Sequence, residues 1–222
     1  MAAPLGYDLT VQQLIPGYAS LARLAVALLA ASQRASLPGA SVLVAGCGTG
    51  AELVEARSQR PDWQLRAIDP SAEMLAAAQQ RLGPASEGIN WQQTTVEGLE
   101  AQSCFAGALS VLVLQSLPDD GTKLAFLTAL ARSLEPGGQL VLVDLMAPDR
   151  SPLQAQEEAA WLGFQRASGL TADTEELEAL THGLHPIGRA RLTALVNAAG
   201  FGDPARIFQA LGYEGFLLQR LG

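Results

Sequence analysis

A ten-residue run, SVLVAGCGTG at 41–50, limits the fold of this chain more than any other feature. Its aliphatic residues predict a buried strand, and glycines follow at alternate positions: Gly46, Gly48 and Gly50. The next stretch, ELVEARSQR, has helix-forming composition. A strand, a glycine turn and a helix in this order present backbone N–H groups to a ligand at the helix N-terminus. Glycine is needed because the turn requires unusual φ and ψ angles and the ligand lies against bare backbone.

A second apolar run, at 65–68, ends in Asp69. An acid at the end of the second strand can accept hydrogen bonds from both ribose hydroxyls of a nucleoside. The competing interpretation is a carboxylate that caps the junction between strand and helix. Together the turn and the acid predict a nucleoside-cofactor site.

Strand-like and helix-like segments alternate over most of the chain. The expected strands are 41–45, 64–68, 89–93, 108–114 and 138–145, and the expected helices are 19–35, 50–60, 71–82 and 119–134. This alternation predicts an α/β fold, a doubly wound and mostly parallel sheet that binds ligands at the carboxyl ends of its strands. At 222 residues we expect a single domain over 1–222.

Two segments are expected to lie over those strand ends. Residues 1–38 form an N-terminal arm and helix, in which Tyr7 and Tyr18 either pack on the domain or place a hydroxyl over the cofactor. Residues 147–186 are polar and acidic and predict a lid insertion with amphipathic helices at 152–167 and 173–182. Beyond them we expect a helix that ends at Gly200 and a β-hairpin around Gly212.

Composition limits the partners. The 22 acidic and 14 basic residues give a net charge of −8, which disfavours nucleic-acid binding and favours a small-molecule substrate. Cys47 and Cys104 are too few for a disulfide framework or a cysteine metal site, so no metal is expected. The apolar stretch at 19–31 is short for a membrane span and contains Arg23, and the N-terminus lacks the basic region of a signal peptide. We therefore expect a cytoplasmic protein.

The order of motifs resembles the class I S-adenosylmethionine (SAM) dependent methyltransferases. VLVAGCGTG resembles their first motif, AIDPSAEML their second, and SLEPGGQLVLVD their fifth strand and the turn before it. The resemblance implies a Rossmann-like, seven-stranded sheet with an antiparallel C-terminal hairpin strand, SAM as cofactor and S-adenosylhomocysteine as product. The cofactor-binding residues it implies are Tyr18, Gly46, Cys47, Gly48, Thr49, Asp69, Pro70, Met74, Thr95, Val96, Val111, Leu112 and Gln115.

By this resemblance each part of the cofactor has its own residues. The glycine turn holds the methionine and ribose side, Asp69 binds the ribose diol, and Pro70 and Met74 line the adenine face. Thr95 and Val96 flank the adenine edge. Val111, Leu112 and Gln115 lie under the reacting centre.

The chain is also similar to the carboxy-SAM synthase branch of this family. IPGY at 15–18, LQSL at 114–117, FQRASG at 164–169 and FQALGYEGFLL near the C-terminus carry this similarity. It implies that Tyr18 reaches the amino-acid end of the cofactor and that the protein is a homodimer. That branch has a lid arginine that binds an extra carboxylate, whereas the corresponding TADTEELEALTHGLHP has no arginine or lysine and several acids. Because like charges repel, we favour ordinary SAM.

The first motif departs from the family as well. Val44 occupies a position where the family commonly has an acid near the methionine amino group, and Thr95 replaces an acid at the adenine edge.

The sequence marks no evident general base. His182 and His185 are candidates because histidine titrates near neutrality, although a structural role is the alternative. Glu157, Trp161 and Phe164, with Arg166, fit either an acceptor pocket or plain helix packing.

Two other functions stay open. Gly46-x-Gly48-x-x-Ala51 satisfies the loose fingerprint of NAD(P)-dependent oxidoreductases, and a SAM-binding protein without catalytic activity fits the missing acid and base.

Overall fold

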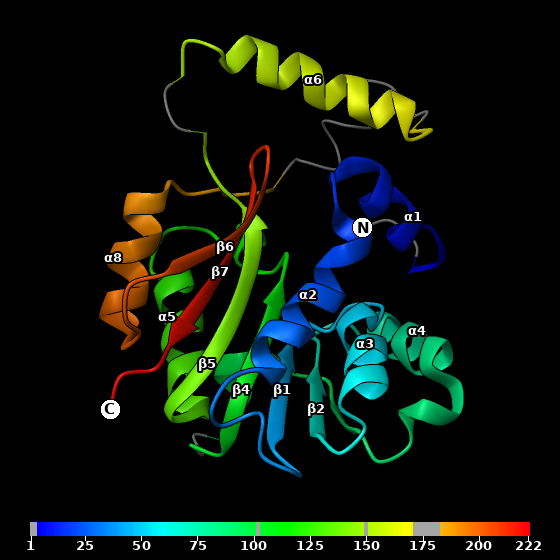
Figure 1. Ribbon diagram of the computed structural model, residues 1–222, viewed down its shortest axis with the longest axis vertical. Coiled ribbons are helices and arrows are strands. Elements are labelled where there is room, and N and C mark those ends of the chain that lie inside the picture. Colours follow the sequence, from blue (N-terminus) through cyan, green and yellow to red (C-terminus); the bar gives the residue numbers. More distant parts are fainter. Residues whose placement is uncertain (1–3, 101–102, 149–150, 171–182) are drawn as a thin grey trace.

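The computed structural model describes residues 4–100, 103–148, 151–170 and 183–222 of the chain (Figure 1). The helices are α1 (Pro4–Leu14), α2 (Tyr18–Ala30), α3 (Ala51–Gln59), α4 (Ala72–Leu82), α5 (Thr122–Ser133), α6 (Gln154–Ala167) and α8 (Arg189–Ala199). The strands are β1 (Ser41–Ala45), β2 (Gln64–Ile68), β3 (Asn90–Gln92), β4 (Phe105–Val111), β5 (Leu134–Leu145), β6 (Ala205–Ala210) and β7 (Tyr213–Gln219). Short 3₁₀ turns lie at Gly83–Ser86, Val96–Gly98 and Leu114–Ser116.

All seven strands form one sheet in the order β3-β2-β1-β4-β5-β7-β6. The pairs from β3 to β5 are parallel, whereas β7 is antiparallel to both β5 and β6. The doubly wound, seven-stranded, mostly parallel fold with an antiparallel C-terminal hairpin is therefore confirmed.

The two faces of the sheet bury alternate side chains of each strand, as pleating requires. In β1, Leu43 and Ala45 belong to the core on the side of α5 and α8, whereas Val42 and Val44 belong to the core on the side of α2, α3 and α4. Helices cover both faces of the sheet (Figure 1), so both sides of β1 are buried and its sequence is a continuous apolar run after Ser41.

Helix α2 lies very close to β4 at Gly107. A Cβ atom at Gly107 would come 2.5 Å from Cδ1 of Leu29, a residue with no exposed surface. A glycine is therefore required in the middle of this strand, where it would otherwise weaken the sheet.

Most of the predicted elements are confirmed with small shifts in their ends, but three of them have wrong boundaries. The helix expected at 19–35 ends at Ala30. The strand expected at 108–114 is Phe105–Val111, because Leu112 takes a φ of 60° and ends it. The strand expected at 138–145 begins at Leu134, because Leu134 pairs with Phe105 of β4 before a shift in register, and the pairing resumes at Gln139. Apolar composition does not mark these backbone features.

The segments expected over the strand ends are there. The N-terminal arm is a helix, α1, which contacts α2, α4 and α6, and the predicted lid helix at 152–167 is α6 (Figure 1). The helix expected at 173–182 lies outside the described residues. Among the described residues no single helix is long and apolar enough to cross a membrane. Helices α1 and α2 reach that length and apolar composition only together, over Gly6–Leu14 and Tyr18–Ala30, and they are bent by 93° between these segments.

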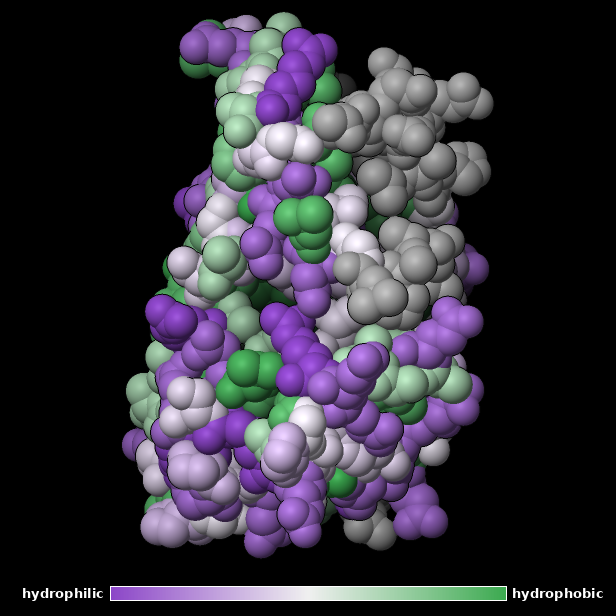
Figure 2. Space-filling view, turned by 90° about the vertical axis from the view of Figure 1, so that its right-hand side faces the viewer, coloured by the Kyte–Doolittle hydropathy of each residue, from purple (hydrophilic) through white to green (hydrophobic). Residues whose placement is uncertain are grey.

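On the face that carries α1, α3 and α4, hydrophobic residues form small separate spots among hydrophilic ones (Figure 2). Of the helices on this side, α3 has Arg57 and α4 has Arg81 in its last turn.

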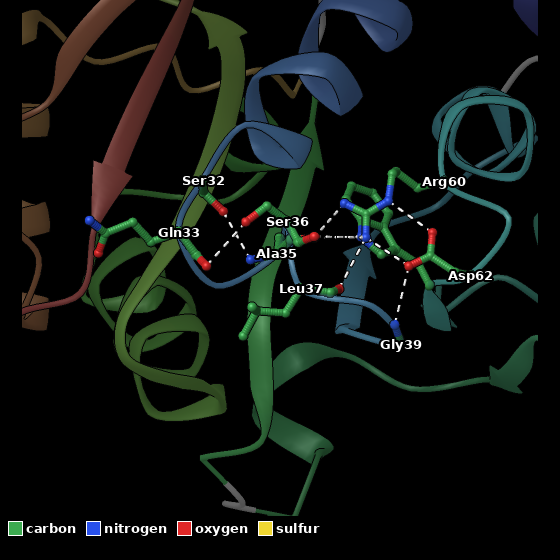
Figure 3. A network of polar contacts seen from close by, with 9 residues as sticks. Ser32, Gln33, Ala35, Ser36, Leu37, Gly39, Arg60 and Asp62 are labelled. Carbon is green, nitrogen blue, oxygen red and sulfur yellow. Dashed lines mark hydrogen bonds and ion pairs between the residues drawn. The ribbon is translucent and has the colours of Figure 1, made fainter.

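One guanidinium group joins two loops at the amino end of the sheet (Figure 3). Arg60 donates hydrogen bonds to the carbonyls of Ala35, Ser36 and Leu37 and forms a bidentate ion pair with Asp62, at 2.7 and 2.8 Å. Asp62 in turn accepts from the Gly39 amide. This ion pair holds the pKa of Asp62 well below its usual range.

We predict that Arg60→Ala destabilises the fold by about 1–3 kcal/mol, since several backbone carbonyls lose a charged donor. Urea unfolding followed by the fluorescence of the adjacent, buried Trp63 measures this. Arg23→Ala is the matched control, because Arg23 is 74% exposed and pairs only at 3.4 Å with Glu55. Equal stabilities of the two variants would contradict the prediction.

Candidate functional site

The glycine turn after β1 is fixed to the end of β2 by one carbonyl. The amides of Gly46 and Cys47 both donate to the oxygen of Ile68 at 2.9 Å, and the Gly50 amide closes the turn onto Cys47. All the loop glycines have positive φ angles: 71° at Gly46, 48° at Gly48 and 85° at Gly50. The sequence pattern therefore produces the strained turn that the glycines predicted.

The amides at the start of α3 remain open to a ligand. In the part of the chain that the structure describes, neither Thr49 nor Ala51 donates its backbone N–H to a protein acceptor. Unpaired amides at a helix N-terminus bind anionic or polar ligand groups.

Asp69 lies directly against this turn. Its Oδ2 atom accepts from the amide of Gly48 at 2.9 Å, and its Oδ1 atom accepts from the amide of Ser71 at 2.9 Å. Asp69 is only 8% exposed. Asp69 therefore does cap the junction between strand and helix, and each of its carboxylate oxygens keeps a second lone pair for a ligand hydroxyl.

Helix α1 is held over the turn by polar contacts. Asp8 accepts a hydrogen bond from Oγ1 of Thr49 at 2.6 Å and forms an ion pair of 2.8 Å with Arg81 of α4. Arg81 also donates to the Thr49 hydroxyl at 3.4 Å. The N-terminal arm therefore contacts the predicted cofactor loop itself.

Two tyrosines of the arm lie beside the turn. Tyr7 is close enough to Glu52, Asp8 and Asp69 for their charges to act on it, and burial together with these charges raises its pKa to about 12. Burial and the charge of Glu52 also raise the pKa of Tyr18. Both hydroxyls are therefore protonated and can donate hydrogen bonds near neutral pH.

Cys47 points into the same buried region. Burial and the charges of Asp69 and Glu52 raise the pKa of its thiol to about 12. It is therefore a packed thiol and not a nucleophile at neutral pH.

The predicted adenine side is formed by the ends of β2 and β3. Gln93 donates to the Pro70 carbonyl at 3.2 Å, and Met74 is buried in the first turn of α4, which Ser71 caps as predicted. Thr95 is exposed. Val96 is buried in the core on the α5 side, where it lines a cavity of about 430 Å³ with residues of α5.

After β4 the chain turns sharply onto the glycine loop. Leu112, at a φ of 60°, donates its amide to Val143, and Val113 packs on Gly46 so closely that a Cβ atom there would lie 2.4 Å from Cγ2 of Val113. Val111 and Leu112 are half-buried at this point.

Gln115 joins the ends of β4 and β5. Its amide donates to Oδ1 of Asp144 at 2.9 Å, its side-chain oxygen accepts from the amide of Leu145 at 2.8 Å, and its carbonyl accepts from the amide of His185 at 2.6 Å. The side-chain oxygen of Gln115 is therefore bound to the backbone of β5, and the residue holds the ends of β4 and β5 together.

Beneath that junction lies a buried pair of opposite charges. Asp144 is 2% exposed, its Oδ2 atom has no hydrogen-bond partner, and burial raises its pKa to about 7. Lys123 has no exposed surface, donates to the Leu114 carbonyl, and burial lowers its pKa.

Of the two candidate bases the structure describes only His185. His185 is exposed and its charge acts on Asp120, ahead of α5, while His182 lies outside the described residues. On α6, Glu157 and Arg166 are exposed and Phe164 is half-buried. Within the described residues there is no group of three or more His, Cys, Asp or Glu side chains that could hold a metal ion.

A small apolar cluster closes the carboxyl edge of the sheet. Val11 of α1 and Ile15, the residue after that helix, pack with Tyr213 of β7. The residues around them are Tyr7, Leu14, Tyr18, Leu112, Leu145, Trp161 and Phe208. Trp161 of α6 donates to the carbonyl of Leu14 at 2.7 Å and meets Tyr213 edge to face. This cluster joins the arm, the lid helix and the terminal hairpin over the site.

Comparisons with known proteins agree with this geometry. Residues 42–138 match the family described as methyltransferase domain. Over 114 residues, 50% of this chain, the sequence is 34% identical to a ubiquinone biosynthesis O-methyltransferase of Xanthomonas campestris pv. campestris and covers 46% of that protein. Residues 42–138 therefore form a methyltransferase domain, and the chain is similar to class I SAM-dependent methyltransferases. This similarity favours a methyltransferase over an NAD(P)-dependent oxidoreductase.

Other members extend the similarity along the chain. A carboxy-S-adenosyl-L-methionine synthase of Shewanella sp. is 26% identical over 163 residues, 72% of this chain and 65% of the relative. The solved structure of 1,6-didemethyltoxoflavin-N1-methyltransferase from Burkholderia thailandensis has a TM-score of 0.62 at 20% identity, covering 100% of this chain and 92% of that one. The chain spans about half the length of the O-methyltransferase relatives it matches.

Several charged residues of the site escaped the sequence-based predictions. Asp8 and Arg81 lie far apart in sequence and meet only in the fold, so no local pattern marks them. Glu52, Lys123 and Asp144 are buried charges; an acid in an otherwise apolar strand, as at Asp144, was a signal that could have been used.

We predict that Gly46→Ala destabilises the unliganded protein by about 1–3 kcal/mol more than Gly48→Ala, because only the former must displace Val113. Both positions have positive φ, so alanine strains the backbone in both variants. The difference between the two variants therefore reports the contact with Val113 alone. Urea unfolding of both variants gives the difference, and equal losses would refute the close contact.

A second prediction concerns pH. The pKa of Asp144 is raised from 3.8 to about 7, so the folded state binds the carboxyl proton more tightly than the unfolded state does. The contribution of Asp144 to the free energy of unfolding therefore falls as pH rises from about 4 to about 7. Asp144→Asn removes this contribution, so the variant gains stability relative to wild type as pH rises through that window. Urea unfolding at pH 4.5 and pH 8 measures the effect; a constant difference between the proteins would contradict it.

Proposed function

We propose that this protein transfers the methyl group of SAM to a small-molecule acceptor. The observation that carries the proposal is the direct contact between the glycine turn and Asp69, which puts open amides and a carboxylate on one ligand surface. A carboxylate that accepts hydrogen bonds from hydroxyls, next to backbone amides that donate them, fits a nucleoside with a polar tail. SAM is the cofactor of the methyltransferases to which the chain is similar.

The residues of the chain would act by binding and orientation. Asp69 accepts the ribose hydroxyls, the amides of Thr49 and Ala51 bind the polar end, and Met74 and Pro70 lie on the side of the base. SAM supplies an electrophilic methyl group, and alignment of donor and acceptor can lower the barrier by roughly 7–11 kcal/mol. Glycines in the loop let the ligand lie against the backbone, and α1 excludes water above it.

The acceptor surface is the apolar cluster under α1 and α6. Leu112, Leu145 and Trp161 present aliphatic and aromatic groups next to the end of β4. This chemistry suits a small, partly apolar acceptor, and the net charge of −8 disfavours a nucleic acid. Related proteins are described as acting in ubiquinone biosynthesis and on 1,6-didemethyltoxoflavin.

A second candidate function is carboxy-SAM synthesis. The similarity to the Shewanella synthase, which covers 72% of this chain, favours it. The acidic segment that would face the extra carboxylate disfavours it, since both groups are anionic. Mass spectrometry of the ligand that co-purifies with the protein distinguishes SAM from carboxy-SAM. A cytoplasmic location and a homodimer remain predictions.

The first test of methyl transfer is ligand binding followed by turnover. Thermal shift with SAM, S-adenosylhomocysteine and NADH should show stabilisation by the first two only. A methyl-transfer assay with labelled SAM over a panel of phenolic and heterocyclic acceptors then tests turnover. Tight SAM binding with no turnover on any acceptor would favour a non-catalytic SAM-binding protein.

We predict that Asp69→Ala weakens SAM binding at least about tenfold, because the ribose hydroxyls lose a charged acceptor. Isothermal titration calorimetry measures the affinity. Asp203→Ala is the control, since Asp203 bonds Asn197 at the other end of the chain. Unchanged affinity of the Asp69 variant would refute the ribose assignment.

A further inference from the structure

The first turn of α3 buries a carboxylate that the reaction scheme above does not use. Glu52 lies two residues after the glycine turn and is only 6% exposed. Glutamate is seldom buried in this way unless it has a partner of opposite charge. Its neighbours on the same helix, Leu53 and Ala56, are ordinary core residues.

In the described part of the chain, no Lys, Arg or His lies within 4.0 Å of the Glu52 carboxylate. Only its own backbone amide and the more distant charge of Arg81 stabilise the ionised form, and burial raises its pKa to about 7. A buried charge without a counter-ion is costly, so the site is incomplete without a cation or a proton.

The buried Glu52 carboxylate lies near the glycine turn and the arm that covers it. Its charge acts on Cys47 within the turn, and on Tyr7 and Tyr18 of the arm that covers the turn. Tyr7 and Cys47 also respond to Asp69. Glu52, in the first turn of α3, and Asp69, at the end of β2, therefore both act on Cys47 and Tyr7.

The strand that enters the turn brings no charge of its own. Val44 and Ala45, at the end of β1, are apolar and buried. The buried carboxylate next to the turn is thus supplied by the start of α3, at Glu52, and not by β1.

We propose that Glu52 binds the α-ammonium group of the methionyl end of the cofactor. This inference rests on the proposed SAM function and adds the residue that recognises the amino-acid half of the ligand. With Asp69 on the ribose diol, the ammonium group is the cation that the ligand brings to the buried carboxylate. The ammonium group then supplies the counter-ion that the unliganded protein lacks.

Nucleosides that share the adenosine half but differ in the tail test this role. The ligands are S-adenosylhomocysteine, which has the ammonium group, 5′-methylthioadenosine, which lacks the whole amino-acid tail, and decarboxylated SAM, which keeps the amine without the carboxylate. Calorimetry is done on wild type, Glu52→Gln and Glu55→Gln. Glu55, on the same helix, pairs with the exposed Arg23 and serves as the matched control.

We expect Glu52→Gln to lose about tenfold or more in affinity for S-adenosylhomocysteine and for decarboxylated SAM, and less than about twofold for methylthioadenosine. Glu55→Gln should bind all these ligands as wild type does. Asp69→Asn should weaken all of them, because each contains the ribose. Urea unfolding of Glu52→Gln should show a fold at least as stable as wild type, since a buried charge is removed.

Each other result overturns a defined part of the proposal. Equal losses for methylthioadenosine and S-adenosylhomocysteine would mean that Glu52 only shapes the loop, and no loss for either would mean that it does not contact the ligand. A wild-type protein that binds none of these nucleosides would instead refute the SAM function itself.

Discussion

The carbonyl of Ile68 and the carboxylate of Asp69 organise the site, because between them they bind the first amides of the glycine turn. Gly46, Cys47 and Gly48 each donate to one of these two neighbouring groups at 2.9 Å. A turn of three positive-φ glycines has no regular hydrogen-bond ladder of its own, so its conformation depends on these acceptors. The parallel register of β1 and β2, which pairs Ala45 with Ile68, brings the acceptors to the turn.

A second constraint is electrostatic. Glu52, Asp69 and Asp8 surround the turn, and Arg81 is the cation that contacts this group directly, through Asp8. The result is a region of excess negative charge at the end of the sheet where we propose that SAM binds. A cationic ligand is favoured there, and the sulfonium and ammonium groups of SAM are both cations. The same acidity works against a ligand with an additional carboxylate.

The sequence predicted the layered fold and the cofactor loop well, because both rest on local patterns. Alternating apolar runs specified the strands, and the spacing of Gly46, Gly48 and Gly50 specified the turn. The end of β4 was misplaced because the backbone reversal at Leu112 leaves no mark in apolar composition. The contacts of Asp8 with Thr49 and Arg81 were missed because they join residues far apart in the chain. The acceptor was not predictable, since the apolar cluster that we propose as its surface is assembled from the arm, α6 and the hairpin.

The attachment of α1 has a kinetic consequence. The ion pair between Asp8 and Arg81 is about one-third exposed on both side chains, and such a pair contributes only about 0.2–1 kcal/mol. Val11 and Ile15 are nearly fully buried, and burial of an aliphatic side chain contributes about 1.5–3 kcal/mol. For a ligand that enters between α1 and the turn, the rate of entry and release is therefore governed by the apolar anchors of the helix. Salt concentration, which screens the ion pair, changes that rate only slightly.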